Sequence, residues 1–127
     1  MEAHTTPAVL LHTARALCDA GEWQTTFWST RAVALLTRQA METWLAQYWE
    51  AAAPLVAAVR SRRAQFLLLH DQLAHDDVVL GHATWEHLSA ACHYKLFELE
   101  PSREQALRWI AQAERFGAAL EQAQRRR

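Results

Sequence analysis

The chain has 127 residues, enough for one domain with a single hydrophobic core. Hydrophobic residues make up 51% of the chain, a composition typical of globular proteins. The formal net charge is −1, so the chain has no overall positive charge that would attract nucleic acid or an anionic membrane. Cys18 and Cys92 lie far apart in the sequence, which argues against a disulfide scaffold and against a cysteine-based zinc site. The sequence shows no signal peptide and no apolar run of membrane-spanning length, so we expect a cytoplasmic protein that makes no use of a membrane.

The composition favours helices. Alanine, leucine, glutamine and arginine dominate and are strong helix formers, whereas glycine and proline occur only three times each. Valine and isoleucine are scarce, so strands have little support. We therefore predict an all-α fold: a single antiparallel bundle of four to five helices over residues 1–127, with residues 1–6 and 122–127 as frayed ends.

Capping and helix-breaking residues delimit the first two helices. Thr5 and Thr6 are placed to cap a first helix, which Gly21 closes. A second helix is predicted from residue 23 to residue 52, before Pro54, and at about 1.5 Å per residue it forms the spine of the bundle. Its predicted apolar stripe consists of Val33, Leu36, Ala40, Trp44 and Tyr48, widened by Leu35, Met41 and Leu45. The aromatic residues at both ends of this helix indicate core packing or, in part, a dimer interface.

Three further segments complete the predicted bundle. A third covers residues 55–74, with a break marked by Ser61. The sequence at 75–77 is predicted to be a loop that caps a fourth helix, residues 78–94. Ser102 and Gln105 form a capping box that starts the last helix. The predicted buried line of that helix consists of Ala106, Trp109, Ile110, Ala113, Phe116 and Leu120.

Four polar residues share one face of the fourth predicted helix: His82, Glu86, Ser89 and His93. His87 lies about 100° around the helix from Glu86. Imidazoles and a carboxylate on one rigid face suit general acid–base chemistry, and the alternative is the solvated side of an amphipathic helix. The spacing of His82 and Glu86 also suits a metal, but the sequence has no Glu-x-x-His pair, so we predict no metal site.

Two charged clusters lie outside that helix. Arg60, Arg62 and Arg63 are predicted either to be solvated or ion-paired, or to form a phosphate-binding patch for RNA. His70 and Asp71, together with residues 75–77, are interpreted as the end of one helix and the capped start of the next.

The run from Trp85 to Trp109 is the most distinctive part of the chain. It reads LSAACHYK over residues 88–95, FELEPS over 97–102 and LRW over 107–109. This run resembles the C-terminal part of small bacterial helical proteins related to the HEPN superfamily (higher eukaryotes and prokaryotes nucleotide-binding). The likeness covers the last third of the chain, and the helix that contains RQAME at 38–42 fits more loosely.

The resemblance implies a helical bundle that is usually dimeric. Many members of that superfamily are metal-independent endoribonucleases of toxin–antitoxin and antiviral systems, and others are inactive partners of nucleotidyltransferases or RNA-processing accessories. Active members carry an arginine followed, after four to six residues, by a histidine at the dimer interface. With His93 in the histidine role, positions 86–88 of this chain hold Glu86, His87 and Leu88 instead of the arginine. Arg63 and His70 have the spacing, but so loose a motif also arises by chance.

The resemblance therefore implies a homodimer of RNA-directed defence or toxin–antitoxin type, either a metal-independent endoribonuclease or a relative with weak or lost activity. In an active enzyme His93 would be the general base, and His87 or Lys95 would take the arginine's role beside Glu86. RNA is the expected substrate, a nucleotidyltransferase, toxin or antitoxin the expected protein partner, and no cofactor is expected. The alternatives are a non-catalytic interaction module, such as an antitoxin or accessory subunit, and a metal- or cofactor-binding bundle.

Overall fold

The computed structural model describes residues 6–19, 27–93 and 101–126, and all regular structure in these ranges is helical. This confirms the predicted all-α bundle. Its long helices are α1 (Pro7–Asp19), α2 (Phe27–Ala52), α5 (His75–Cys92) and α6 (Arg103–Arg125). Three short elements connect α2 to α5, namely α3 (Pro54–Ala57), α4 (Arg62–Leu68) and the 3-10 turn η2 (Leu69–Asp71). Within the described ranges, no helix is both long and apolar enough to cross a membrane.

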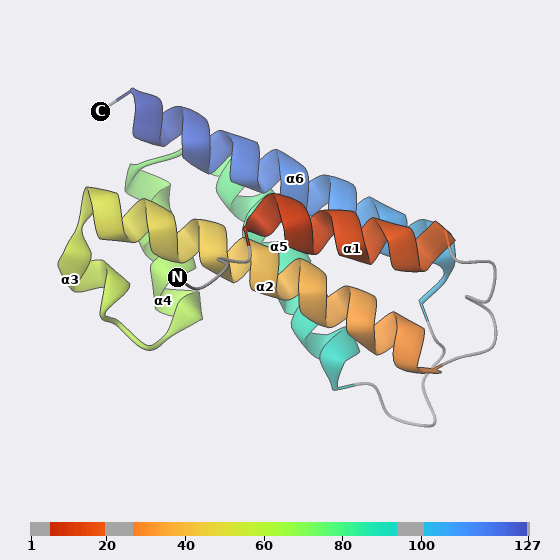
Figure 1. Ribbon diagram of the computed structural model, residues 1–127. Helices are drawn as coiled ribbons and strands as arrows, with labels where there is room; N and C mark the ends of the chain where they lie inside the picture. Colours follow the sequence, from red (N-terminus) through yellow and green to blue (C-terminus); the bar gives the residue numbers. More distant parts are fainter. Residues whose placement is uncertain (1–5, 20–26, 94–100, 127) are drawn as a thin grey trace, which may run out of the picture.

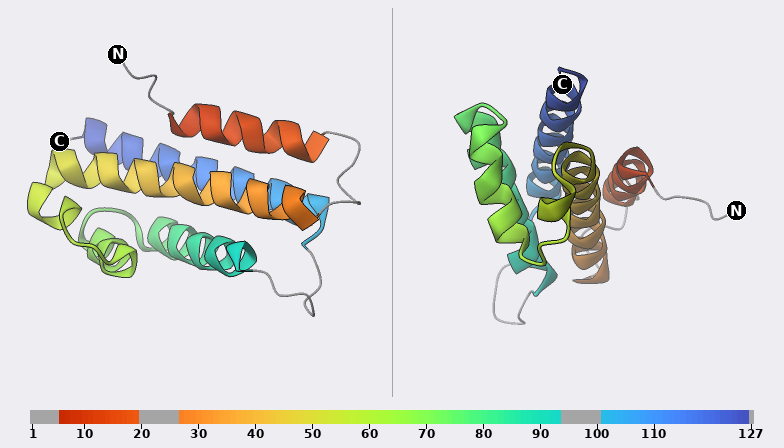
Figure 2. Two further views of the ribbon diagram at one scale, coloured as in Figure 1. Left: turned by 60° about the horizontal axis from the view of Figure 1, so that its bottom comes forward. Right: turned by 90° about the vertical axis from the view of Figure 1, so that its left-hand side faces the viewer.

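Helix α2 is the centre of the bundle. It packs against α1, α5 and α6, while α6 also contacts α1 and α5. Figures 1 and 2 show α2 and α6 side by side between α1 and α5. Consecutive long helices run in opposite directions, so α5 runs antiparallel to α2 and its C-terminal end lies beside the N-terminal half of α2 (Figure 1). This pairing brings together residues that are about sixty positions apart in the chain.

Two glycines allow α6 to approach its neighbours closely. A Cβ atom added at Gly81 would lie 2.3 Å from Cδ1 of Phe116, and one added at Gly117 would lie 2.4 Å from Cε2 of Trp44. Both distances are far below van der Waals contact, so an aromatic ring occupies the space that a side chain would need. The predicted buried line of the last helix, from Ala106 to Leu120, is confirmed in full.

The helix starts follow local capping chemistry. Thr6 Oγ1 accepts a hydrogen bond from the Val9 amide at 3.2 Å, and Ser102 Oγ accepts one from the Gln105 amide at 3.0 Å. These caps begin α1 and α6 as the sequence predicts. The predicted closure at Gly21 and the predicted start of the second helix at residue 23 lie outside the described residues.

The predicted break at Ser61 is confirmed, because Ser61 Oγ accepts a hydrogen bond from the Ala64 amide and starts the separate helix α4. Several other predicted boundaries need correction. Residues 75–77 are not a loop but the first turn of α5, where the carboxylates of Asp76 and Asp77 favour the positive end of the helix dipole. Residues 122–125 belong to α6 instead of fraying, and α5 ends at Cys92. Leu35, predicted in the core, is 41% exposed.

Candidate functional site: an arginine-lined groove between helices α2 and α5

A groove of about 520 Å³ lies where the C-terminal end of α5 meets the N-terminal half of α2. We call it the arginine groove. Helix α2 contributes Arg31, Leu35 and Arg38, whose spacing of four and then three residues places them on one face of the helix. The remaining walls come from Ala32 and from Cys92 and His93 of the other helix.

Arg31 joins the two helices at this point. Its Nε and Nη2 atoms donate hydrogen bonds to the Cys92 carbonyl oxygen at 3.1 and 2.8 Å. That carbonyl belongs to the last turn of α5, where a cation also interacts favourably with the negative end of the helix dipole. Arg31 therefore fixes the end of α5 against α2.

His93 follows directly as the C-cap residue of α5. Its backbone amide donates to the Ala90 carbonyl oxygen at 3.1 Å, and its side chain is exposed. The imidazole lies at the edge of the groove. Its backbone is held by this hydrogen bond to Ala90 and by the bonds from Arg31 to the neighbouring Cys92 carbonyl.

Arg38 brings a positive charge that the described part of the chain does not neutralise. The side chain is partly buried, its Nε atom has no hydrogen-bond partner, and it makes no ion pair with any described residue. The nearby acid one turn further along α2, Glu42, instead accepts a hydrogen bond from Trp85 Nε1 at 2.9 Å. A partly buried guanidinium without an anion is unfavourable, and a bound anion would relieve that cost.

Cys92 lines the groove as a neutral thiol. Burial raises its pKa, and this effect outweighs the opposing influence of the Arg38 and Arg31 charges. The thiol is therefore protonated at neutral pH and offers an apolar wall, not a nucleophile. With Ala32 and Leu35 it forms an apolar strip between two guanidinium groups and an imidazole.

The chemistry of this groove suits an anion that also carries an apolar or flat part. Guanidinium groups match phosphate oxygens with paired donors, and an imidazole can accept a proton near neutral pH. Across the described residues, no group of three or more histidine, cysteine, aspartate or glutamate side chains is placed to hold a metal ion.

The predicted catalytic residues occupy different places. His93 lines the groove, whereas Glu86 and His87 are exposed on α5 and lie outside its walls. Lys95 lies outside the described residues. Of the three predicted catalytic residues that the structure describes, only His93 lines the groove.

The predicted RNA-binding cluster lies at the other end of α2. Arg60, Arg62 and Arg63 follow its C-terminus, and at 1.5 Å per residue the stretch from Arg31 to the helix end at Ala52 is about 30 Å long. Arg60 and Arg63 are exposed, while Arg62 is partly buried and donates from Nη1 to Gln65 Oε1 at 3.0 Å. The cluster and His93 therefore form two separate surfaces of the chain.

The polar stripe of α5 is not a uniform solvated face. The ring of His82 stacks on Phe66, with centroids 5.2 Å apart and planes 10° apart, and its side chain is only 19% exposed. Its Nε2 lies 2.9 Å from Glu86 Oε1, but the angle is not that of a hydrogen bond. Ser89 Oγ is also buried, with no hydrogen-bond partner in the described ranges. Helix α4 covers this part of α5, so His82 is a packing residue and not a member of a catalytic row.

The sequence prediction missed Arg31 and Arg38. Their signal was present, because two arginines seven residues apart fall on one face of an otherwise apolar helix. The family motif places the arginine a few residues before the histidine on the same helix, whereas in this chain both arginines of the groove come from α2.

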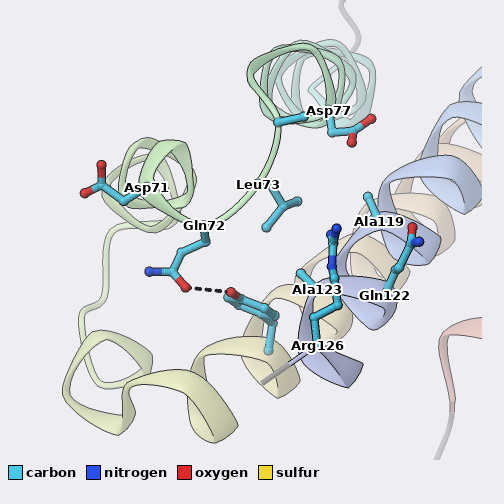
Figure 3. A pocket seen from close by; sticks show the side chains of 10 residues that line it. Asp71, Gln72, Leu73, Asp77, Ala119, Gln122, Ala123 and Arg126 are labelled. Atoms are coloured by element: carbon cyan, nitrogen blue, oxygen red, sulfur yellow. Dashed lines mark hydrogen bonds between the residues drawn. The ribbon is translucent and has the colours of Figure 1, made fainter.

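Two other hollows are more mixed in character. One, of about 470 Å³, lies between η2, the start of α5 and the end of α6. Figure 3 shows the Arg126 side chain extending from the end of α6 toward Leu73 and the Asp71 side chain pointing away. The dashed line marks the hydrogen bond of 2.8 Å that the Tyr48 hydroxyl donates to Gln72 Oε1. Another, of about 500 Å³, runs along α2 and is lined by Gln39, Glu42, Thr43, Gln47, Glu50 and Arg62, with Leu10 and Ala46. Charges of both signs line these two hollows, so neither favours one class of ligand as the arginine groove does.

Comparison of the chain with protein-family models, with curated proteins and with solved structures finds no match.

Proposed function

We propose that this chain is an RNA-binding helical bundle of HEPN-like type that cleaves single-stranded RNA without a metal, with the arginine groove as its site. The observation that supports this proposal is that Arg31, Arg38 and His93 line one open groove. Arginine and histidine are the residue pair that the sequence resemblance implies. In this chain the arginines come from α2, so the missing arginine before His93 on α5 does not exclude the chemistry.

Each residue has a role that follows from its surroundings. Arg38 binds a phosphate and stabilises the charge that develops on its oxygens, because its guanidinium is not neutralised by any described residue. His93, exposed at the edge, takes the proton from the ribose 2′-hydroxyl. Arg31 is a positioning residue, since its donors hold the Cys92 carbonyl and thereby the backbone that carries His93.

The proposed reaction uses the nucleophile that RNA itself carries. The 2′-oxygen attacks the adjacent phosphorus as His93 accepts its proton, and the bond from phosphorus to the 5′-oxygen breaks. The departing 5′-oxygen takes a proton from water in the open groove. The products are a 2′,3′-cyclic phosphate and a free 5′-hydroxyl end.

We further propose that the protein acts as a homodimer, as the sequence resemblance implies. Light scattering of the purified protein should then give a mass near twice 14.5 kDa. A strict monomer at micromolar concentration would remove any mechanism in which two copies share the site.

The test combines binding and cleavage of a labelled single-stranded RNA in the presence of a chelator. Arg38→Met should weaken binding and reduce the slope of log affinity against log salt by about 0.7, the value for one phosphate contact on a single strand. His93→Ala should retain binding but lower the cleavage rate by about two to four orders of magnitude. The matched controls are Arg108→Met on α6 and His12→Ala on α1, both exposed and outside the groove, which should leave binding and cleavage unchanged.

The outcomes separate the alternatives. Cyclic phosphate ends that appear with wild type and vanish with His93→Ala support the proposed reaction. Binding without cleavage would reduce the function to RNA binding. Failure of the wild type to bind varied RNAs at low salt would overturn the proposal in favour of a non-catalytic interaction module.

A further inference from the structure

A second surface projects at the end of the bundle where α2 ends. We call residues 54–67 the α3–α4 corner, and Figures 1 and 2 show its short helix α3 at that end of the molecule. Its aliphatic side chains are unusually exposed: Leu55 is 87%, Leu67 54% and Val59 40% exposed. Helix α3 packs Val56 and Ala57 partly against the core but buries none of its residues fully, so its outer face is left uncovered. Exposed aliphatic residues that lie close together on a small domain indicate an interaction surface.

The charge of this corner has one sign. No aspartate or glutamate occurs between Glu50 and Asp71. Arg60 and Arg63 are exposed, and neither forms an ion pair with a residue in the described ranges. Arg63 and Leu67 lie one turn apart on α4, so one face of this helix presents a cationic and an apolar side chain together.

A buried glutamine holds the corner in place. Gln65 is 0% exposed, and its Nε2 donates to the carbonyl oxygens of Val59, Val56 and Ala57 at 2.8, 3.1 and 3.5 Å. Its Oε1 accepts the hydrogen bond from Arg62 described above. The fold thus uses a fully buried polar side chain to fix a helix whose own residues are at most partly buried. Leu55 and Val59 are therefore presented on an ordered backbone.

We propose that the α3–α4 corner docks on the surface of an anionic lipid bilayer, with Leu55, Val59 and Leu67 entering the interface and Arg60 and Arg63 contacting the headgroups. The corner offers RNA no exposed aromatic ring on which bases could stack, since its one aromatic residue, Phe66, is buried. A symmetric contact with a second copy would bring its arginines against their own counterparts. The exposed aliphatic residues and arginines of the corner line none of the three hollows described above, and α3 stands at one end of the bundle (Figures 1 and 2). The partner that matches a projecting aliphatic and cationic surface is an anionic bilayer.

Sedimentation of the full chain with lipid vesicles tests this proposal. Vesicles of phosphatidylcholine with phosphatidylglycerol should pull the protein down at low salt, and vesicles of phosphatidylcholine alone should not. The double variant R60Q/R63Q should partition about thirtyfold less, at about fivefold for each arginine near the surface. Leu55→Ser should lower partitioning at least about tenfold, because one leucine side chain no longer enters the apolar region.

The matched controls lie on other faces: Val9→Ser on α1, where Val9 is 53% exposed, and Arg108→Gln on α6. Both should partition like wild type, and all variants should keep the helical circular dichroism. Equal binding to neutral vesicles, or equal losses in the controls, would overturn the proposal. So would a loss of RNA affinity in R60Q/R63Q without lipid binding, or a change from dimer to monomer in Leu55→Ser. Because no variant touches the arginine groove, failure here leaves the proposed function untouched.

Discussion

Replacement of Gln65 by leucine measures how much the hydrogen bonds of the Gln65 side chain contribute to the free energy of unfolding. Leucine has a similar volume, so the change leaves no large cavity, but it removes the amide that donates to three carbonyl oxygens. The two shorter bonds, 2.8 and 3.1 Å, each contribute about 1 kcal/mol net, and the bond at 3.5 Å contributes little. Arg62 also loses its acceptor. Water can reach part of these carbonyls because α3 is exposed, so we expect a loss of about 2–3 kcal/mol in the free energy of unfolding.

Urea unfolding followed by far-UV circular dichroism measures this loss. The control is Gln47→Leu, an exposed glutamine on α2, which should change the free energy of unfolding by less than about 0.5 kcal/mol. A loss in Gln65→Leu no larger than in this control would refute the claim that the buried network holds the corner. A stabilised variant would show that the apolar replacement packs better than the hydrogen bonds it removes.

Three further predictions concern other contacts. Gly81→Ala should lower the free energy of unfolding by about 1–2 kcal/mol, because the new Cβ would overlap the buried Phe116 ring of α6; this cost exceeds the gain from the better helix propensity of alanine. A variant that is more stable than wild type in urea unfolding would contradict this prediction. The hydrogen-bonded ion pair with Arg15 lowers the pKa of Glu114 below its ordinary value of 4.5, so Glu114→Gln should lower the free energy of unfolding by under about 1 kcal/mol at neutral pH. The difference between the variant and the wild type should disappear as the pH falls through the lowered pKa, and a difference that persists in acid would contradict the prediction. Arg38→Met should raise the pKa of Cys92 further and slow its alkylation near pH 9, as mass spectrometry of the labelled peptide would show, and an unchanged rate would place the guanidinium too far from the thiol.

The sequence predicts those parts of the fold that depend on local chemistry. Ser102 and Thr6 cap helices because their hydroxyl groups accept hydrogen bonds from amides three residues away, which is a property of a few neighbouring positions. The buried line of α6 follows from the helical period alone. The start of α5 was misplaced because Asp76 and Asp77 suit both an N-cap and a first turn, and only the backbone distinguishes the two.

The candidate site depends on packing between distant segments, which a single sequence does not show. Arg31 and His93 meet because α5 runs antiparallel to α2, and no pattern within either helix specifies that register. His82 illustrates the same limit in the other direction. Its spacing places it with Glu86 and His93 on one stripe, but α4 folds over that part of the helix and stacks Phe66 on the imidazole. Spacing assigns a residue to a face, and tertiary packing decides whether that face is open.

Arg38 provides the sharpest test of whether the groove exists for binding. A partly buried guanidinium with no anionic partner in the described structure costs stability, so a residue kept only for folding would be better replaced by an apolar side chain of similar length. Arg38→Met should therefore raise the free energy of unfolding by about 1 kcal/mol while it lowers RNA affinity, as expected where stability is given up for function. Arg31→Met should do the opposite and lower the free energy of unfolding by about 1–2 kcal/mol, because the Cys92 carbonyl loses both donors. If Arg38→Met destabilises the protein as much as Arg31→Met, the Arg38 guanidinium is a structural group and not an anion-binding group.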